Sequence, residues 1–316
     1  MNNFLFIDFG ASKVKTIEYN FRENKFSPQY QVDSPFLQVE AIHKKDLLSF
    51  VSNVIKNHRD IAAIIPCSIL GGGYDGELYY SWKANKKLTE NTCLLSGLFK
   101  GDASYHVHED HGGKIDKLTF LGKIGQNSFY SSLGDTDCVK RSFPLDNKSC
   151  IVNLGTGSQV IKEQNMVKYI PSGRALNSYR SFFSQLGVDI FDLFEDRTVD
   201  DLLGATMSFD LNMFEQALNY KEIGGMISGI NEKNFTLKNF IDSLFASYLN
   251  QYIPYIYDSD KIYLTGGISR RYPAIRDYFQ LKTGKDVLLR SEYIEDTFLG
   301  IKNKLLEDYE HINHRR

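Results

Sequence analysis

Apolar residues near the N-terminus form a short continuous run, and a glycine ends it. The run covers residues 4–8 and Gly10 follows it, which predicts a buried strand that enters a turn. Beyond the turn, residues 14–19 alternate between two faces, as they do in a strand. The pattern therefore predicts a hairpin of two strands, with residues 11–13 at its tip.

A helical pattern follows the hairpin. Apolar residues recur at spacings of three and four between residues 47 and 55, which predicts an amphipathic helix over residues 43–58. A second apolar run at residues 61–66 predicts another buried strand. Strands that alternate with a helix indicate an α/β architecture, and residues 85–130 are expected to form short elements and loops.

The second half of the chain repeats this order of elements. An apolar run at residues 149–154 stops at Gly155, and a strand resumes at residues 160–161. A long apolar stripe over residues 237–253 predicts a helix that faces the core. A strand at 261–264, a helix from about residue 272, a strand at 287–289 and a helix over 294–309 follow.

Length and composition fit a protein of two domains. The chain has 316 residues, and domains average roughly 150 residues, so we place the domains at residues 1–147 and 148–316. We expect the final helix to pack toward the first domain.

Charge and hydropathy exclude several classes of protein. Lysine and arginine number 37 against 39 acidic residues, a net charge of −2, which argues against a nucleic-acid or membrane partner. No stretch approaches the roughly 20 apolar residues of a membrane helix, and the N-terminus lacks the basic region of a signal peptide. The four cysteines show no metal or disulfide spacing. These observations predict a cytoplasmic protein.

The first candidate motif is the segment Asp8, Gly10, Ser12 and Lys13 at the predicted hairpin turn. A carboxylate at a strand end, followed by turn N–H groups and a hydroxyl, suits a phosphate together with Mg²⁺ held by Asp8, often through water. An ordinary hairpin turn is the alternative for this motif alone.

The second candidate motif lies in the other half of the chain, at Gly155, Thr156, Gly157 and Ser158. Its glycines allow a close approach of the backbone, and its hydroxyls are donors for phosphate oxygens. The motif lacks the lysine of a P-loop, so that class of nucleotide-binding protein is not indicated. A simple turn remains the alternative.

Two further segments complete the set. Gly266, Gly267 and Ser269 follow a predicted strand, where a glycine pair can pass beneath a flat ring or a sugar, or form an ordinary turn. Asp135 precedes Gly155 by 20 residues and is a candidate general base that accepts a hydroxyl proton during attack on a γ-phosphate. Asp137 is the candidate if the register differs by two, and a solvated turn acid is the alternative.

The order of these motifs resembles the sugar kinase/Hsp70/actin superfamily, in which two related domains each supply a phosphate hairpin. Within it, the motifs are similar to those of FGGY carbohydrate kinases: DFGASKVK to the first phosphate motif, GDTDCVK to the catalytic block, NLGTGSQV to the second phosphate motif and LTGGISR to the adenosine block. The stretch GGMISGINEKNF most resembles the sedoheptulokinase branch.

The resemblance implies a fold and an activity. The fold would be α/β, with two ribonuclease-H-like (actin-like ATPase) domains flanking a nucleotide cleft. The activity would be ATP- and Mg²⁺-dependent transfer of the γ-phosphate to a sugar hydroxyl, with Asp135 as general base. Asp8, Gly10, Ser12, Lys13 and the two glycine motifs would bind the nucleotide. The expected partner is a small sugar or sugar derivative, and a homodimer is one possible assembly.

The chain departs from the FGGY pattern where the sugar would bind. The chain is short for that family, and where the family has Gln-His-Gly this chain reads SILGG at residues 68–72. In the next element Trp82 is kept, but Ala84 and Lys86 replace a carboxylate and an arginine, and lysine cannot reproduce the arginine fork. Trp82 and Asp137 are the candidate substrate contacts that remain.

These departures leave two alternatives to an FGGY kinase open. The GTGS quartet is also similar to the N-acetylglucosamine kinase/BadF group, whose acceptors are amino sugars. A nucleotide-binding regulator of the same fold, without catalysis, is the other. The segment with His106, His108 and His111 is a candidate acceptor contact, with a metal site or a solvated loop as alternatives.

Overall fold

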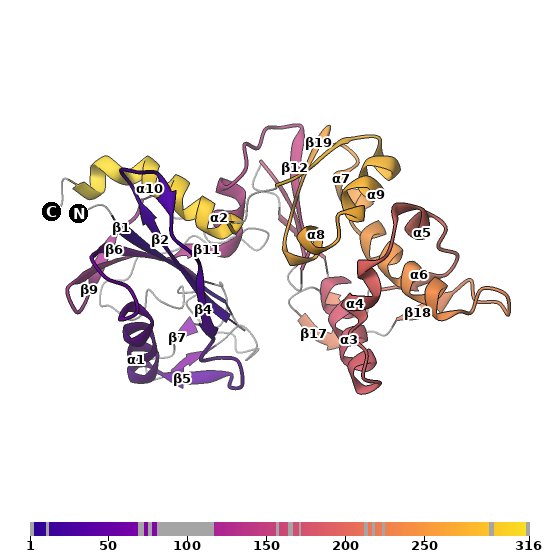
Figure 1. Cartoon of the computed structure of the whole chain (residues 1–316), viewed down its shortest axis with the longest axis horizontal. Coiled ribbons are helices and arrows are strands. Elements are labelled where there is room, and N and C mark those ends of the chain that lie inside the picture. Colours follow the sequence, from indigo (N-terminus) through magenta and orange to yellow (C-terminus); the bar gives the residue numbers. More distant parts are fainter. Residues whose placement is uncertain are drawn as a thin grey trace. The chain divides into compact units, whose positions relative to one another are not determined.

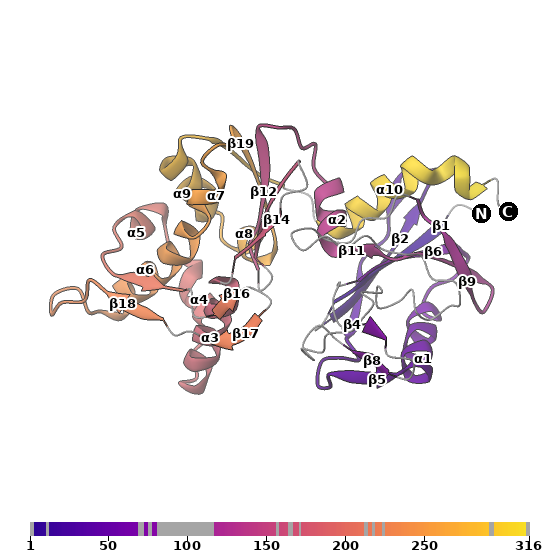
Figure 2. The same cartoon turned by 180° about the vertical axis from the view of Figure 1, so that it is seen from behind.

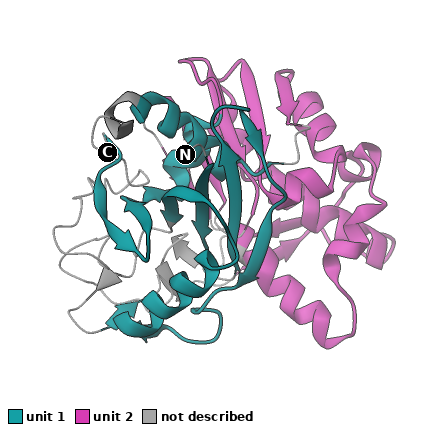
Figure 3. Ribbon diagram, turned by 60° about the vertical axis from the view of Figure 1, so that its left-hand side comes forward, with its two compact units in different colours: residues 1–142, 293–316 teal, residues 143–292 magenta. Residues whose placement is uncertain are grey.

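The computed structural model describes residues 3–10, 13–68, 73–74, 78–80, 117–155, 158–163, 167–170, 172–211, 214–216, 219–222, 225–290 and 294–313. It divides into two compact units, unit 1 with residues 1–142 and 293–316 and unit 2 with residues 143–292 (Figure 3). The division lies close to the expected boundary at residue 147. Residues 293–316 lie in unit 1, although the expected second domain ran to residue 316.

Unit 1 is built on a mixed sheet in the order β3-β2-β1-β6-β10-β9, with β4 paired to β2 and β11 paired to β6. Its strands are β1 (Asn3–Phe9), β2 (Lys13–Asn20), β3 (Lys25–Phe26), β4 (Tyr30–Asp33), β6 (Ile61–Ser68), β9 (Phe120–Ile124), β10 (Asn127–Tyr130) and β11 (Leu133–Gly134). β1 runs antiparallel to β2 and parallel to β6. A separate small sheet has β5 (Ala41–His43), β7 (Gly73–Tyr74) and β8 (Leu78–Tyr80).

Both faces of the unit 1 sheet are covered by helices (Figure 1). Leu5, Ile7 and Phe9 of β1 share a core with α1 (Lys44–Ile55). Phe4 and Phe6 belong to the core on the other face, which also contains residues of α2 (Asp135–Arg141) and α10 (Asp296–Asn313). Successive strand residues point to opposite faces. Asp8 is therefore on the α2 and α10 side, at the end of the Phe4–Phe6 row.

α10 belongs to unit 1 because its apolar face is part of that core. Phe298, Ile301 and Leu305 are fully buried there, at helical spacing, and Asp308 accepts a 2.7 Å hydrogen bond from the backbone N–H of Leu118. These contacts explain why the C-terminal residues fold with the first half of the chain.

Unit 2 repeats the sheet topology of unit 1. Its sheet has the order β14-β13-β12-β19-β20, with β12 antiparallel to β13 and parallel to β19. Figure 2 labels β12, β14 and β19 of this sheet. The strands are β12 (Ser149–Asn153), β13 (Gln159–Lys162), β14 (Val167–Tyr169), β19 (Lys261–Thr265) and β20 (Asp286–Leu289). The two sheets therefore correspond strand by strand. The central strand β12 corresponds to β1, its antiparallel partner β13 to β2, and its parallel partner β19 to β6.

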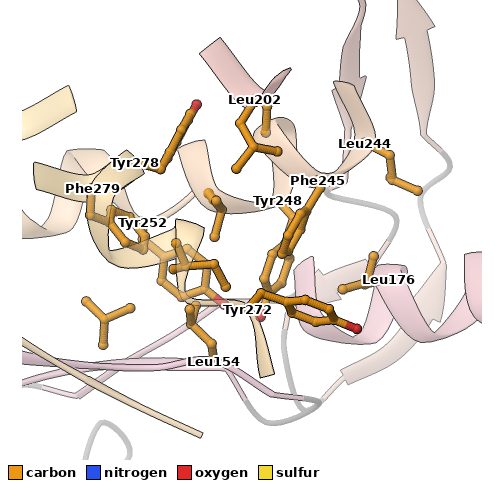
Figure 4. Close-up of a cluster of buried hydrophobic side chains, with 14 of the residues drawn as sticks. Leu154, Leu176, Leu202, Leu244, Phe245, Tyr248, Tyr252, Tyr272, Tyr278 and Phe279 are labelled. Carbon is orange, nitrogen blue, oxygen red and sulfur yellow. Dashed lines mark hydrogen bonds between the residues drawn. The ribbon is translucent and has the colours of Figure 1, made fainter. Parts of the chain in front are cut away.

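The described core of unit 2 is one continuous cluster (Figure 4), whereas that of unit 1 is divided between the two faces of its sheet. The helices of unit 2 are α3 (Ser172–Gln185), α4 (Ile190–Glu195), α5 (Val199–Leu203), α6 (Leu237–Asn250), α7 (Ile253–Ile256), α8 (Gly267–Arg271) and α9 (Ala274–Thr283). Two short strand pairs join β15 (Ser208–Asp210) to β18 (Met226–Ser228) and β16 (Phe214–Gln216) to β17 (Asn219–Glu222). α6 fills the centre, and its stripe is the one that the sequence predicts.

The structure confirms the predicted α/β class and most of the predicted strands. Three helices between residues 172 and 203 were not predicted. Among the described residues, no helix is both long enough and apolar enough to span a membrane.

Candidate functional site

The first phosphate motif lies at the turn between β1 and β2, where Gly10 closes the hairpin. The Gly10 N–H donates to the Lys13 carbonyl over 3.0 Å. A Cβ at position 10 would lie 2.7 Å from that same oxygen, so the turn requires glycine. Ser12 lies outside the described residues.

Asp8 lies two residues before this turn, on the strand that occupies the middle of the sheet. It is opposite Lys15 in β2 and Cys67 in β6. Burial raises the pKa of Asp8 to about 7, the Lys15 ammonium opposes that rise, and the carboxylates of Glu295 and Asp135 add to it. Asp8 is thus an acidic group in a site with too little positive charge, which suits a cation ligand.

Lys15 is the lysine that faces Asp8, and the sequence analysis missed it. Its ammonium contacts both carboxylate oxygens of Glu295, at 2.7 and 2.8 Å. The predicted Lys13 is instead exposed and paired with Asp33. The sequence could have indicated Lys15 through the register of the hairpin. With Phe9 paired to Val14, Lys15 rather than Lys13 lies opposite Asp8.

Asp135 is the first residue of α2 and comes directly after β11. β11 and β1 both pair parallel to β6, so Asp135 and Asp8 lie at the carboxyl ends of the two strands on either side of β6. The Thr136 N–H donates to Asp135 over 2.7 Å. Burial nevertheless raises the pKa of Asp135, against the lowering effect of that hydrogen bond.

Asp137 does not share this environment. Its carboxylate accepts a 2.8 Å hydrogen bond from the Arg141 guanidinium, which also binds Glu307 of α10. Asp137 therefore joins α2 to α10, and Asp135 is the α2 carboxylate that is coupled to Asp8.

Close packing among β6, α2 and α10 holds the elements next to Asp8 and Asp135 in place. The buried thiols of Cys67 in β6 and Cys138 in α2 are hydrogen-bonded to each other. A Cβ at Gly300 of α10 would lie 1.9 Å from the Cys138 carbonyl oxygen. The backbones of α2 and α10 are therefore in direct contact one turn after Asp135.

The second phosphate motif occupies the equivalent turn of unit 2, between β12 and β13. The Ser158 hydroxyl is fully buried, donates to the Gly155 carbonyl at 2.5 Å and lies 3.3 Å from the Tyr248 hydroxyl. A Cβ at Gly173 of α3 would lie 1.9 Å from the Gly155 oxygen. Ser158 therefore shapes the turn in this structure. Thr156 and Gly157 lie outside the described residues.

The glycine pair after β19 lies against the end of β12. Gly266 has a φ of +94°, and a Cβ there would lie 2.2 Å from the Leu154 carbonyl oxygen, so two requirements select glycine. The buried Ser269 hydroxyl donates to the Gly266 carbonyl over 2.9 Å. A Cβ at Gly267 would have no heavy atom within 4 Å. Unit 2 thus brings the second phosphate motif and the glycine pair together at one sheet edge.

The donor set of unit 1 fits Mg²⁺ bound partly by substrate. Magnesium binds through one or two carboxylates plus phosphates and water, and Asp8 with Asp135 offers carboxylate oxygens of that kind. Among the described residues, no group of three histidine, cysteine or acidic side chains could hold a metal ion. Trp82, His106, His108 and His111 lie outside the part of the chain that the structure describes.

Comparison with solved structures identifies the fold. The chain is similar to xylulose kinase from Lactobacillus acidophilus, with a TM-score of 0.62 and 13% identity over 96% of this chain and 89% of that chain. It is similar to glycerol kinase from Plasmodium falciparum solved with ADP, with a TM-score of 0.61 and 11% identity over 97% and 90%.

A third solved structure belongs to a different kind of protein. The activator of the 2-hydroxyisocaproyl-CoA dehydratase from Clostridium difficile, with bound ADPNP, matches at a TM-score of 0.50 and 9% identity over 99% of this chain and 98% of that chain. No protein-family model matches the sequence, and no curated protein matches it.

The chain therefore has the fold of the actin-like ATPase sugar kinases, as predicted. The high coverage and TM-scores to FGGY-type carbohydrate kinases confirm the resemblance seen in the sequence at the level of fold. The sedoheptulokinase branch within that group stays a prediction.

Proposed function

We propose that the protein is an ATP- and Mg²⁺-dependent carbohydrate kinase, which transfers the γ-phosphate of ATP to a hydroxyl of a sugar or sugar derivative. The observation that carries this proposal is the placement of Asp8 and Asp135 at the carboxyl edge of the unit 1 sheet, at the ends of two strands that pair with β6. The nucleotide-type turns of unit 2 and the kinase fold support it.

In this mechanism Asp135 is the general base. It would accept the proton of the sugar hydroxyl as that oxygen attacks the γ-phosphorus, and the bond to the β,γ-bridging oxygen breaks. A base is most effective when its pKa is near the working pH, and burial raises the pKa of Asp135 in that direction.

Asp8 would hold Mg²⁺, which supplies positive charge to the β- and γ-phosphate oxygens. Lys15 lies opposite Asp8 and limits the charge repulsion between the carboxylates. We propose that the backbone N–H groups of the turns at Gly10 and Gly155–Gly157 bind the phosphates. Gly266, Gly267 and the helix that follows are assigned to the adenosine.

The acceptor is the least constrained part of this proposal, because the residues that usually contact the sugar are replaced at positions 84 and 86. The test measures ADP release from MgATP against ketoses including sedoheptulose, polyols, amino sugars and heptose derivatives. Acceptor-dependent ADP release with a phosphorylated product supports the proposal. An amino sugar as the best acceptor would favour the N-acetylglucosamine kinase/BadF group.

Substitution of the two α2 acids tests the assignment of the base. Asp135→Asn should lower kcat roughly 10²- to 10⁴-fold while ATP still binds. Asp137→Asn removes the partner of Arg141, so it should lower stability and retain transfer. Full activity of Asp135→Asn, or loss of transfer only in Asp137→Asn, contradicts the assignment.

A nucleotide-binding regulator is the second candidate. The match to a dehydratase activator with bound ADPNP favours it, as do the replaced sugar contacts. Tight binding of MgATP without turnover on any acceptor of the panel would support this candidate and overturn the kinase.

A further inference from the structure

Behind the second phosphate motif, three hydroxyl groups form a buried chain within unit 2. The Tyr252 hydroxyl donates to the Tyr248 hydroxyl over 3.1 Å, and Tyr248 lies 3.3 Å from the Ser158 oxygen. Ser158 in turn donates to the Gly155 carbonyl. All three side chains are buried, so each hydrogen bond is made in a low-dielectric interior, where it is stronger than in water.

The direction of the chain follows from the number of donors. A hydroxyl has one hydrogen to donate. Ser158 gives its hydrogen to Gly155, so Tyr248 must donate to Ser158 and Tyr252 to Tyr248. The order is therefore Tyr252, Tyr248, Ser158 and the Gly155 carbonyl. Burial raises the pKa of Tyr248 to about 12, so its hydroxyl keeps this hydrogen throughout the physiological range.

The chain of hydroxyl groups ends on the carbonyl of Gly155, the first residue of the turn. The oxygen of a carbonyl is the negative end of its dipole, and directed at a triphosphate it would repel the ligand. Ser158 holds the Gly155 carbonyl from one side, and the backbone of Gly173 meets the same oxygen from α3. Two elements of the core, α3 and α6, thus converge on the first residue of the turn.

We propose that Tyr248, supported by Tyr252, is a positioning residue for the second phosphate motif. Its hydroxyl holds Ser158, and Ser158 holds the Gly155 carbonyl away from the nucleotide phosphates. This inference rests on the proposed nucleotide site, and it assigns a function to two tyrosines that otherwise belong to the hydrophobic core (Figure 4).

The experiment compares Tyr248→Phe with Tyr278→Phe by calorimetric titration with MgATP. Tyr278 is a matched control, because it is equally buried in the same cluster and its hydroxyl donates to Asn250 over 2.9 Å. Figure 4 shows that hydroxyl pointing away from Leu154, at the far end of the cluster. Each substitution thus removes one buried hydroxyl. Tyr278→Phe loses one hydrogen bond, whereas Tyr248→Phe loses two, of which the one to Ser158 acts on the turn.

Tyr248→Phe should raise the Kd for MgATP roughly tenfold, which corresponds to the loss of one hydrogen bond. Tyr278→Phe should leave the Kd within about twofold of the wild type. The titration also reports the fraction of competent sites. Damage to folding alone would lower that fraction and leave the Kd unchanged.

Two further variants test the order of the hydrogen bonds between the three hydroxyl groups. Ser158→Ala should raise the Kd about as much as Tyr248→Phe, and the double variant should be no worse than either, because both act through the Gly155 carbonyl. Tyr252→Phe should have a smaller effect, since the bond from Tyr248 to Ser158 remains.

The outcomes separate this inference from the proposed function. Wild-type protein that binds no MgATP overturns both. Wild-type protein that binds MgATP, with equal Kd values for Tyr248→Phe and Tyr278→Phe, overturns the positioning role alone. The Kd is measured without an acceptor, so the positioning role is tested even when no sugar is turned over.

Discussion

Gly300 of α10 is a position where one methyl group should disturb α2 and with it Asp135, the proposed general base. Gly300→Ala would place a Cβ 1.9 Å from the Cys138 carbonyl oxygen, 2.4 Å from its carbon and 2.5 Å from the Cys138 Cα. All three are backbone atoms of α2, so no side-chain rotation relieves the contact. Since ordinary contacts begin near 3.4 Å, the two helices must separate by roughly 1.5 Å.

The effect of Gly300→Ala on the free energy of unfolding has two parts of opposite sign. Overpacking of a core costs about 1–3 kcal/mol, whereas alanine is favoured over glycine inside a helix by about 1 kcal/mol. The difference is a net loss of up to roughly 2 kcal/mol in the free energy of unfolding. The effect on catalysis should be larger, because α2 begins with Asp135 and a displacement of about 1 Å costs roughly 100-fold in rate.

The assay combines urea denaturation, followed by circular dichroism, with steady-state transfer and MgATP binding. Gly300→Ala should lower both the midpoint and kcat. Its Kd for MgATP should change much less, since the second phosphate motif and the glycine pair lie in unit 2. Gly204→Ala is the matched control, because Gly204 has a negative φ and its Cβ would meet the Asp200 carbonyl only at 3.1 Å. A Gly300→Ala protein with wild-type stability and kcat would refute the role of this contact in holding Asp135.

Three further predictions concern the two sheet edges. Burial raises the pKa of Asp8 to about 7, so the folded protein binds this proton more tightly than the unfolded chain and loses stability as the pH rises from about 4 to 7. Asp8→Asn should therefore stabilise the metal-free protein at pH 8 by on the order of 4 kcal/mol, have little effect on stability at pH 4, and abolish transfer. Equal urea midpoints of the variant and the wild type at pH 8 would contradict this. Because burial raises the pKa of Asp135, kcat should fall as this base is protonated, at a pH above the usual aspartate range, in a pH–rate profile. Gly266→Ala puts a side chain at φ +94° and against the Leu154 carbonyl, and should raise the Kd for MgATP at least tenfold, whereas Gly267→Ala, with open space, should not.

The central strands were predictable because their residues obey simple rules. β1, β6, β12 and β19 are apolar runs buried on both faces, each close to a glycine or polar turn, and the prediction placed each within a few residues. Asp8 and Asp135 stood out for the same reason, as acids directly after such a run or turn. At the end of a buried strand, the apolar run that predicts the strand also marks the polar residue that belongs to the candidate site.

Other parts of the site depend on contacts between distant segments, which no local pattern contains. Glu295 binds Lys15 across 280 residues of sequence, and Gly300 meets Cys138 through the packing of α10. Ser158 was predicted as a phosphate ligand from its hydroxyl, but the hydroxyl points to Tyr248 and Gly155. The tertiary partner decided its role. The helix α3 was missed because many polar residues interrupt its apolar positions, and α4 and α5 were missed because helices of six and five residues are too short to show a helical period.

The duplicated sheets explain why one unit carries the acids and the other does not. Asp8 and Asn153 occupy equivalent places, each on the central strand and two residues before the glycine of the first turn. Asparagine keeps the shape of aspartate without its charge, and its Oδ1 lies only 2.7 Å from where a Gly266 Cβ would be, so Asn153 packs against the glycine pair. The same topology thus carries a buried acid at this position in unit 1 and a neutral amide at the equivalent position in unit 2.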